Sequence, residues 1–506
     1  MIASSRNYAI GWVHFLIGGG WKVTTIILAA YVFLFGAGVA LFYYVEFMAR
    51  EPGGGPAMVP DLARVVLILL MGIQGLVLLL VGGYRVAGAI RMDISSRMLE
   101  SHRLMPISSA NAVWGYLFGP TTGVLAFALL NLALSCAFGS LHGVSPGRLM
   151  INQAVILAFA VFTWSLIALG TFIYRHMFFI ALALMFLGMC TTLIIYAPTL
   201  FPGLGLILTP FLGETIFSFG GAGVGKTFDE GYAFGAAGQA ALFLIFFLGT
   251  CRLYRGVYRV VFTEFQAVAL LAVWAVLSTL GLWYSNRIGI QHLFFGMNQE
   301  FDETLGMAQI VASVASCVVL AFVPFWSFLQ EDRRRATHPL LRLGSIVAVA
   351  LLAALPAAGA MWMSSYSIVH LELTLLIVVS QVAILYALLR LAHRMRFWLA
   401  AIVAGGALLV LWVGPLALEV GRIAVLNWQG GNEHDLSVLG TLSPLGYLAA
   451  VWDGNGNLPL LPGLVVQLLA AVVLCTVAYL VVRLKMPESS SPAAPPIVAP
   501  PRSVPS

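Results

Sequence analysis

The pattern in this chain that most resembles a chemical site is a glycine-rich run ending in lysine and threonine, Gly220 to Thr227. It reads GGAGVGKT and matches GxxxxGK[ST] in full, a pattern whose backbone amides and lysine hold nucleotide phosphates. That chemistry needs a strand before the loop, a soluble helix after it and an acidic residue for magnesium on a neighbouring strand. None of this context is expected around Lys226, which lies between two apolar runs joined by too few residues for a nucleotide domain. We therefore expect a glycine-rich turn here.

No other group of side chains has the spacing of a catalytic or metal site. His370 and Glu372 are two residues apart, which places them on different faces of a helix. The five cysteines form no CxxC pair and have no histidine at ligand spacing, so they are interpreted as buried, inert thiols. We expect no catalytic residue, no metal and no cofactor within this chain.

Composition indicates that the solvent of this protein is lipid. Hydrophobic residues make up 61% of the 506 residues and charged residues only 9%, compared with about 25% charged in ordinary soluble domains. The mean hydropathy is +0.97. A soluble chain of this length would need several polar surfaces that these residues cannot provide, so we predict an all-α integral membrane protein.

Twelve apolar runs have roughly the ~20 residues that a helix needs to cross a bilayer. A β-barrel is not favoured, because the runs lack alternation of apolar and polar residues. The predicted spans lie near residues 24–45, 65–84, 112–139, 151–173, 177–198, 234–251, 265–284, 308–329, 343–363, 371–389, 397–417 and 462–482.

Basic residues predict the orientation, because lysine and arginine in short loops tend to stay on the cytoplasmic side. With both termini inside, twenty of the 26 basic residues fall in cytoplasmic segments. The net charge of +6 is thus interpreted as a topology signal and not as affinity for nucleic acid. We expect a multi-pass protein of the cell (inner) membrane with both ends in the cytoplasm.

The two ends of the chain differ from the spans in composition. Residues 1–22 combine Trp12 and Trp21 with Arg6 and Lys22, which favours an interfacial helix over a cleaved signal peptide. Residues 486–506 are rich in proline and serine, and we expect a disordered cytoplasmic tail. Between them we expect two six-helix halves, residues 23–260 and 261–485.

A compact polar segment from Arg91 to Gly115 separates the second and third predicted spans. A helix from Asp93 to Leu104 would direct charged side chains to the cytoplasm and apolar ones to the membrane, with Glu100 and Arg103 at pairing distance. Pro106 should end it, and the candidates to cap the next helix are Ser108, Ser109 and Asn111. We interpret the segment as a docking element; a generic amphipathic loop is the alternative.

The docking segment has a partial echo in EDRRRATHPLLRLG, which begins at Glu331. In both places a charged stretch leads through a proline into an apolar run, and the two prolines, Pro106 and Pro339, lie 233 residues apart. A second pair of cues, LTPFLG around Pro210 and LSPLGY around Pro444, is offset by 234 residues. Such a constant offset predicts two fused copies of one unit.

The run LESHRLMPIS followed by Gly115 resembles the cytoplasmic loop of type-2 ATP-binding-cassette (ABC) export permeases. The chain departs from that pattern at Arg97, where the family often has glycine, and at Tyr116, where it often has lysine. The interfacial first helix, the six spans and a Pro-containing segment before the sixth span also resemble that family, in both halves. The matching residues are Leu99, Glu100, Pro106, Ile107, Ser108 and Gly115.

The resemblance implies a transporter permease that is not itself an enzyme. Its partners would be one or more ABC ATP-binding subunits on the cytoplasmic face, carrying ATP and Mg, together with the lipid bilayer and an unknown exported substrate; no nucleic acid is implied. The residues implied to contact the ATPase subunit are Arg97, Leu99, Glu100, Arg103, Pro106, Ser108, Arg333, Arg334, Arg335 and Pro339. Glu100 and Arg103 are expected to matter more than the three arginines of the second loop.

Two alternatives stay open. An ion-coupled carrier with repeated halves would keep transporting after ATP depletion and stop when the ion gradient collapses. It usually needs ionisable residues deep in the membrane, and none is expected on the predicted spans, where glutamines such as Gln74 and Gln381 should bond neighbouring helices. An intramembrane enzyme acting on lipids would need a converging polar cluster, which one sequence cannot assemble.

Overall fold

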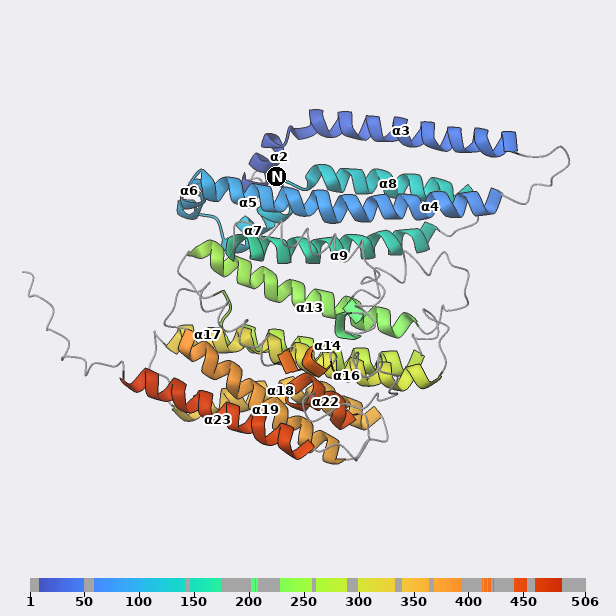
Figure 1. The fold of residues 1–506 in the computed structure, drawn as a ribbon. Helices are drawn as coiled ribbons and strands as arrows, with labels where there is room; N and C mark the ends of the chain where they lie inside the picture. Colours follow the sequence, from blue (N-terminus) through green and yellow to red (C-terminus); the bar gives the residue numbers. More distant parts are fainter. Residues whose placement is uncertain are drawn as a thin grey trace, which may run out of the picture. The chain divides into compact units, whose positions relative to one another are not determined.

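All elements in the described part of the chain are helices, as Figure 1 shows for the computed structural model. Helix is the expected form, because lipid offers no partners to unpaired backbone groups and a helix satisfies its own. The structure describes residues 9–49, 59–141, 146–173, 202–204, 206–207, 228–256, 261–288, 299–332, 339–363, 368–392, 412, 414–415, 417–419, 422, 441–452 and 460–484.

Ten of the described helical segments are long and apolar enough to cross a membrane, and they coincide with ten predicted spans. The protein is therefore a multi-pass α-helical membrane protein. The predicted span 177–198 and all but a few residues of 397–417 lie outside the described residues, as do the tail 486–506 and the run Gly220 to Thr227. The number of twelve spans and the sidedness of the termini stay predictions.

The chain divides into two compact units. The first comprises Met1–Ala336 and Leu351–Ile368, and the second comprises Thr337–Ala350 and Val369–Ser506. This division falls after α17, and the two predicted halves, which meet at residue 260, stay a prediction. The long helices of the first unit are α3 (Gly20–Ala49), α4 (Val59–Leu76), α8 (Thr122–Leu141), α9 (Pro146–Ile173), α13 (Phe228–Arg255), α14 (Glu264–Ile288) and α16 (Gln299–Leu320).

The shorter elements of the first unit and the helices of the second unit complete the described fold. The first unit also holds α2 (Ala9–Ile17), the π-helix η1 (Val77–Gly82), α5 (Gly83–Ser95), α6 (Met98–Leu104), α7 (Ser109–Phe118) and α17 (Phe322–Asp332). Helix α18 (Pro339–Met363) contributes residues to both units, and the second unit holds α19 (Ile368–Ala392), α22 (Pro444–Trp452) and α23 (Leu460–Leu484).

The second span is longer than predicted. Elements α4, η1 and α5 follow one another without a break, and the apolar span runs over Leu69–Ser95 instead of ending at residue 84. It therefore carries Arg85, Arg91 and Asp93. These residues lie beyond residue 84, the predicted end of the span, because the polar segment starts as a continuation of the helix and not as a loop. The absence of ionisable residues near the membrane midplane stays a prediction.

The π-helix η1 lies in the middle of that second span. The indole Nε1 of Trp164 on α9 donates a 2.8 Å hydrogen bond to the carbonyl oxygen of Leu78 in η1. Trp164 is fully buried, and its ring lies where a side chain on Gly82 would be, so only glycine fits there. In a π-helix some carbonyl oxygens lack the hydrogen bond that an α-helix would give them. The indole of Trp164 supplies a donor to one of these oxygens.

The predicted third span is two helices. Helix α7 ends at Phe118, and α8 begins at Thr122 after a turn. A Cβ on Gly119 would lie 2.2 Å from the Cα of Gly11 in α2, so the backbones of α2 and α7 touch at this turn. Gly115 makes a similar close approach to α2 one turn earlier. The short helix α2 therefore packs across α7, and the span proper begins after the crossing.

Glutamines bond neighbouring helices, as predicted. In the first unit, Asn131 Nδ2 on α8 donates to Gln74 Oε1 on α4 at 2.7 Å, and Tyr31 on α3 donates to Asn131 Oδ1 at 2.6 Å. In the second unit, Gln381 Nε2 on α19 donates to Gln467 Oε1 on α23 at 2.7 Å. These side chains satisfy one another within apolar surroundings, which fixes the register of the helices.

Candidate functional site

The segment between the second and third spans folds into α6, a seven-residue helix that reverses the direction of the chain. Helix α5 ends at Ser95, where the hydroxyls of Ser95 and Ser96 both donate to the carbonyl oxygen of Met92, at 2.9 and 2.7 Å. Arg97 then adopts a left-handed backbone with φ of 59°, and α6 starts at Met98. The predicted single helix from Asp93 to Leu104 is thus wrong, because the chain turns at Arg97.

The exit from α6 follows the prediction. Met105 is extended, as the residue before a proline prefers, so α6 ends at Leu104. The Ser108 hydroxyl accepts a 3.2 Å hydrogen bond from the backbone nitrogen of Asn111 and caps the start of α7. Of the three cap candidates, Ser108 is the one that acts as the N-cap.

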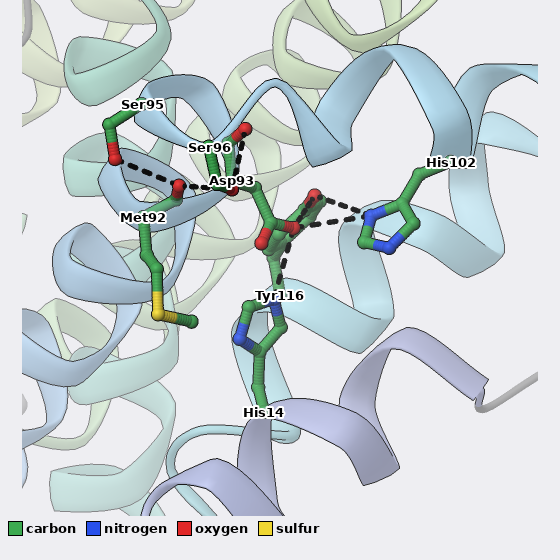
Figure 2. Close-up of polar contacts among 7 residues, drawn as sticks. All are labelled: His14, Met92, Asp93, Ser95, Ser96, His102 and Tyr116. Carbon is green, nitrogen blue, oxygen red and sulfur yellow. Dashed lines mark hydrogen bonds and ion pairs between the residues drawn. The ribbon is translucent and has the colours of Figure 1, made fainter.

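The turn at Arg97 lays α6 over a buried carboxylate, Asp93, which is 1% exposed (Figure 2). Oδ2 of Asp93 accepts a 2.5 Å hydrogen bond from the Tyr116 hydroxyl. The same oxygen lies 3.1 Å from Nε2 of His14 and 3.2 Å from Nδ1 of His102. His14, Asp93, His102 and Tyr116 come from α2, α5, α6 and α7, respectively, and we call them the Asp93 cluster.

The Asp93 cluster supplies partners for a charge that is costly to bury. A carboxylate taken out of water without partners costs several kcal/mol, and here one hydroxyl and two imidazoles surround a single oxygen. Helix α7 lies outside the ten spans, and burial together with the neighbouring carboxylate of Asp93 raises the pKa of Tyr116 above its ordinary value. The phenol therefore stays protonated and remains a donor to Asp93.

A second contact ties α6 to the last helix before residue 260. The guanidinium of Arg103 donates to two main-chain carbonyls at the end of α13, with Nη2 3.1 Å from the Leu253 oxygen and Nε bonded to the Tyr254 oxygen. The last carbonyls of a helix have no partner within it and carry partial negative charge, so an arginine stabilises them. The expected pair with Glu100 is not formed, since Arg103 turns toward α13 and away from the exposed face of α6.

The remaining residues of α6 divide into an inner and an outer face. Leu99 is buried with His102, whereas Glu100 is exposed and has no ion-pair partner within the described residues. Arg97, Pro106 and Ser108 are exposed as well. The outer face is partly apolar: Leu104 is 88% exposed, and Met98 and Met105 are each 43% exposed.

The second predicted docking loop lies largely outside the described residues. This holds for Arg333, Arg334 and Arg335, between the end of α17 and the start of α18. Pro339 is the first residue of α18, a position that suits proline because the first turn of a helix needs no amide donor. Nothing in the described part of the chain tests the predicted ranking of the two loops.

Sequence reasoning missed the Asp93 cluster. Asp93 and His102 lie within the predicted helix Asp93 to Leu104, and His14 lies within the predicted interfacial helix 1–22, but no contact among them is predicted. The available signal was the presence of an acid and a histidine nine residues apart at the end of an apolar run. That signal is weak without the turn at Arg97, which brings the two side chains together.

The Asp93 cluster and Arg103 together connect α6 to four other helices. Helix α6 is attached to α5, α2 and α7 through Asp93 and to α13 through Arg103, so displacing it strains four helices. Comparison with protein-family models, with curated proteins and with solved structures finds no match. A functional assignment therefore depends on these contacts and on the pattern of the sequence.

Proposed function

We propose that this chain is the membrane-spanning permease subunit of an ATP-driven ABC exporter, and that α6 is where a separate ATP-binding subunit docks. The observation that carries this proposal is the exposed apolar outer face of α6, on a short helix outside the spans. A side chain such as Leu104 is stabilised when a partner covers it, and apolar anchors of this kind dominate the binding energy of interfaces.

The attachments of α6 support a role in coupling. A docking helix must pass a displacement to the spans, and a loosely hinged loop would absorb it. The buried contacts of His102 with Asp93 and of Arg103 with the end of α13 connect α6 to the second and the last span of the first predicted half. A partner that moves α6 would thus move two spans together.

The internal duplication belongs to the same proposal, and two parallel contacts support it. Gln239 on α13 donates a 2.7 Å hydrogen bond to the Ile207 carbonyl, just before the Pro210 cue. Gln467 on α23 likewise donates to the Leu442 carbonyl, just before the Pro444 cue. In each half, a glutamine of the last span thus bonds the segment that precedes it, which supports a shared plan, although the two glutamines lie 228 residues apart and not 233 or 234.

An ion-coupled carrier is the second candidate, and the Asp93 cluster is the observation that favours it. A buried carboxylate between two histidines is a combination that carriers use to bind and release protons. The cluster is less suited to that role because Asp93, His14 and His102 are all almost fully buried and hold four helices together. Transport that survives ATP depletion and stops when the proton gradient collapses would favour the carrier.

The test is purification of the full-length chain from its native membranes. We expect an ATP-binding-cassette subunit to co-purify with it, and the complex to hydrolyse ATP in a vanadate-sensitive manner. Leu104→Asp should lose both the subunit and the activity, because it places a charge in the centre of the apolar interface.

A matched control comes from the start of α14. Phe265 is 82% exposed, so Phe265→Asp makes the same change of an exposed apolar side chain away from α6. It should retain both the subunit and the activity. The proposal fails if no such ATPase accompanies the wild-type chain, or if Leu104→Asp keeps the ATPase while Phe265→Asp loses it.

A further inference from the structure

A separate site has no lining residue from α6. A cavity of about 450 Å³ is bounded by α3, by the second span and by α8, with Phe15 of α2 at one end. This volume falls within the range of about 300–1,000 Å³ that is typical of small-molecule sites. Its walls are almost entirely apolar, and they include Ile27, Leu34, Val81 and Phe127.

The cavity opens toward the bilayer. Ile27 and Leu34 of α3 and Val81 of η1 line it and are exposed. Helix α3 packs mainly against α8 and stands at the edge of the first unit (Figure 1). The lining along α3 runs from Val23 to Leu34, a length of roughly 16 Å, which is about half the ~30 Å thickness of the hydrocarbon layer.

Arg85 is the one charged residue that lines the cavity. It lies within the apolar span Leu69–Ser95, and within the described residues its guanidinium forms no hydrogen bond and no ion pair. Nη1 lies 2.5 Å from the position that a Cβ on Gly18 would take, so the guanidinium packs closely against the α2–α3 junction. A cation in such surroundings is costly unless an anion meets it.

The depth of Arg85 fits a lipid headgroup. Trp12 and Trp21 flank the same α2–α3 junction and are both exposed, and tryptophan is enriched where the hydrocarbon layer meets the headgroups. Phe15 packs against Trp21 with ring centroids 5.1 Å apart. The guanidinium therefore lies at the interfacial end of the cavity, and the apolar lining continues from there toward the bilayer centre.

We propose that this cavity binds one membrane phospholipid, with its phosphate on Arg85 and one acyl chain along α3 between the second span and α8. Charge complementarity favours a phosphate as the ligand of Arg85, because a guanidinium binds phosphate oxygens through two parallel hydrogen bonds. The apolar walls and the opening toward the bilayer select the chain. This proposal does not rest on ATP-driven transport, since its test measures binding alone.

The experiment is photolabelling of the full-length protein in nanodiscs with phosphatidylglycerol that carries a diazirine on one acyl chain. Labelled peptides are identified by mass spectrometry and should come from α3 and α8. Arg85→Met should reduce this labelling by about tenfold or more, the effect of losing a hydrogen bond to a charged group, whereas Arg85→Lys should retain most of it. Arg255→Met removes an exposed arginine elsewhere and should change nothing.

A second pair of variants tests the chain-binding part without altering charge. Ile27→Trp fills the cavity, whereas Ile26→Trp places the same ring on a neighbouring residue of α3 that is exposed and does not line it. Labelling should fall in the first variant and persist in the second. All variants are first checked for monodispersity, so that a loss of labelling reflects an intact protein.

Competition separates a phospholipid from its possible substitutes. Excess unlabelled phosphatidylglycerol should abolish labelling of α3 and α8, and neither inorganic phosphate nor diacylglycerol should do so. Displacement by inorganic phosphate would instead show a site for soluble anions. Equal displacement by diacylglycerol, or equal labelling of Arg85→Met and the wild type, would show apolar contact alone, and each of these results would overturn the proposal.

Discussion

Tyr116 donates its hydroxyl to Oδ2 of Asp93 across 2.5 Å, and this bond joins the end of the second span to the start of α7. Tyr116 occupies the position at which the resembled family often has lysine. A phenol here supplies a donor without adding a charge, and two histidines complete the surroundings of the carboxylate. The departure from the family pattern therefore coincides with a buried acid that needs a donor at this place.

Replacing Tyr116 with phenylalanine should destabilise the protein by about 1–3 kcal/mol, because the buried carboxylate of Asp93 loses its shortest hydrogen bond. The measurement is the fraction of monodisperse protein that remains after heating in detergent. Tyr254→Phe is the matched control, since the Tyr254 hydroxyl is buried and has no hydrogen-bond partner among the residues that the structure describes. Equal losses in the two variants would contradict a specific role of the Tyr116 hydroxyl.

Arg97→Gly should stabilise the protein by about 1 kcal/mol, because the φ of 59° at this position strains any residue with a Cβ and suits glycine. Thermal unfolding of the purified variant measures the effect. Ser101→Gly, at an exposed position inside α6, should instead be destabilising by roughly 0.5 kcal/mol. A loss of stability in Arg97→Gly would show that the arginine side chain makes a contact that outweighs its backbone strain.

Gly119→Ala should detach α2 from α7. An added methyl group would lie 2.2 Å from the Cα of Gly11, and neither backbone can move aside without shifting a helix. The expected cost is about 1–3 kcal/mol, as for other overpacked contacts. It is measured by thermal unfolding and by loss of a disulfide cross-link engineered between α2 and α7.

Gly88→Ala provides the comparison, because no described residue lies within 4 Å of its added methyl group. Alanine has a higher helix propensity than glycine, so this substitution in α5 should leave the stability of the protein unchanged or raise it slightly. If Gly88→Ala and Gly119→Ala behave alike, close packing at the α2–α7 crossing is not what requires glycine.

Charge reversal at Glu100 tests the proposed interface directly. Glu100 is exposed on the outer face of α6, so Glu100→Arg should leave folding unchanged while weakening assembly or stimulated ATPase activity. Arg334→Glu in the second predicted loop should have the smaller effect. ATPase assays on the purified complexes compare the loss of activity in the two variants. A larger loss in Arg334→Glu would mean that the second loop makes the main contact.

Hydropathy was sufficient to place ten spans within the described residues, because a run of some twenty apolar residues has few alternatives in lipid. The end of α6 and the cap at Ser108 were predictable for a similar reason, since Pro106 and Ser108 act on their immediate neighbours. Asp93 was not predictable as a buried residue. Its burial depends on the reversal at Arg97, which no local preference of arginine favours.

The prediction that the second span ends at residue 84 is wrong for a related reason. Arg85, Arg91 and Asp93 interrupt the hydropathy, so the span was ended before them, yet backbone hydrogen bonding continues through all three. The break between α7 and α8 falls at Gly119 and Pro120, a pair that hydropathy does not register although proline lacks an amide donor and disfavours helix at the residue before it. The contact of Gly119 with α2, by contrast, joins residues more than a hundred positions apart and has no local signal.

Helix α5 holds both Arg85 and Asp93, which are eight residues and about 12 Å apart along its axis. A stretch this short behaves as a stiff rod. A displacement of α5 that follows a pull on Asp93 therefore also displaces the guanidinium of Arg85 at the interfacial end of the cavity. A partner that displaces Asp93 would therefore also displace Arg85.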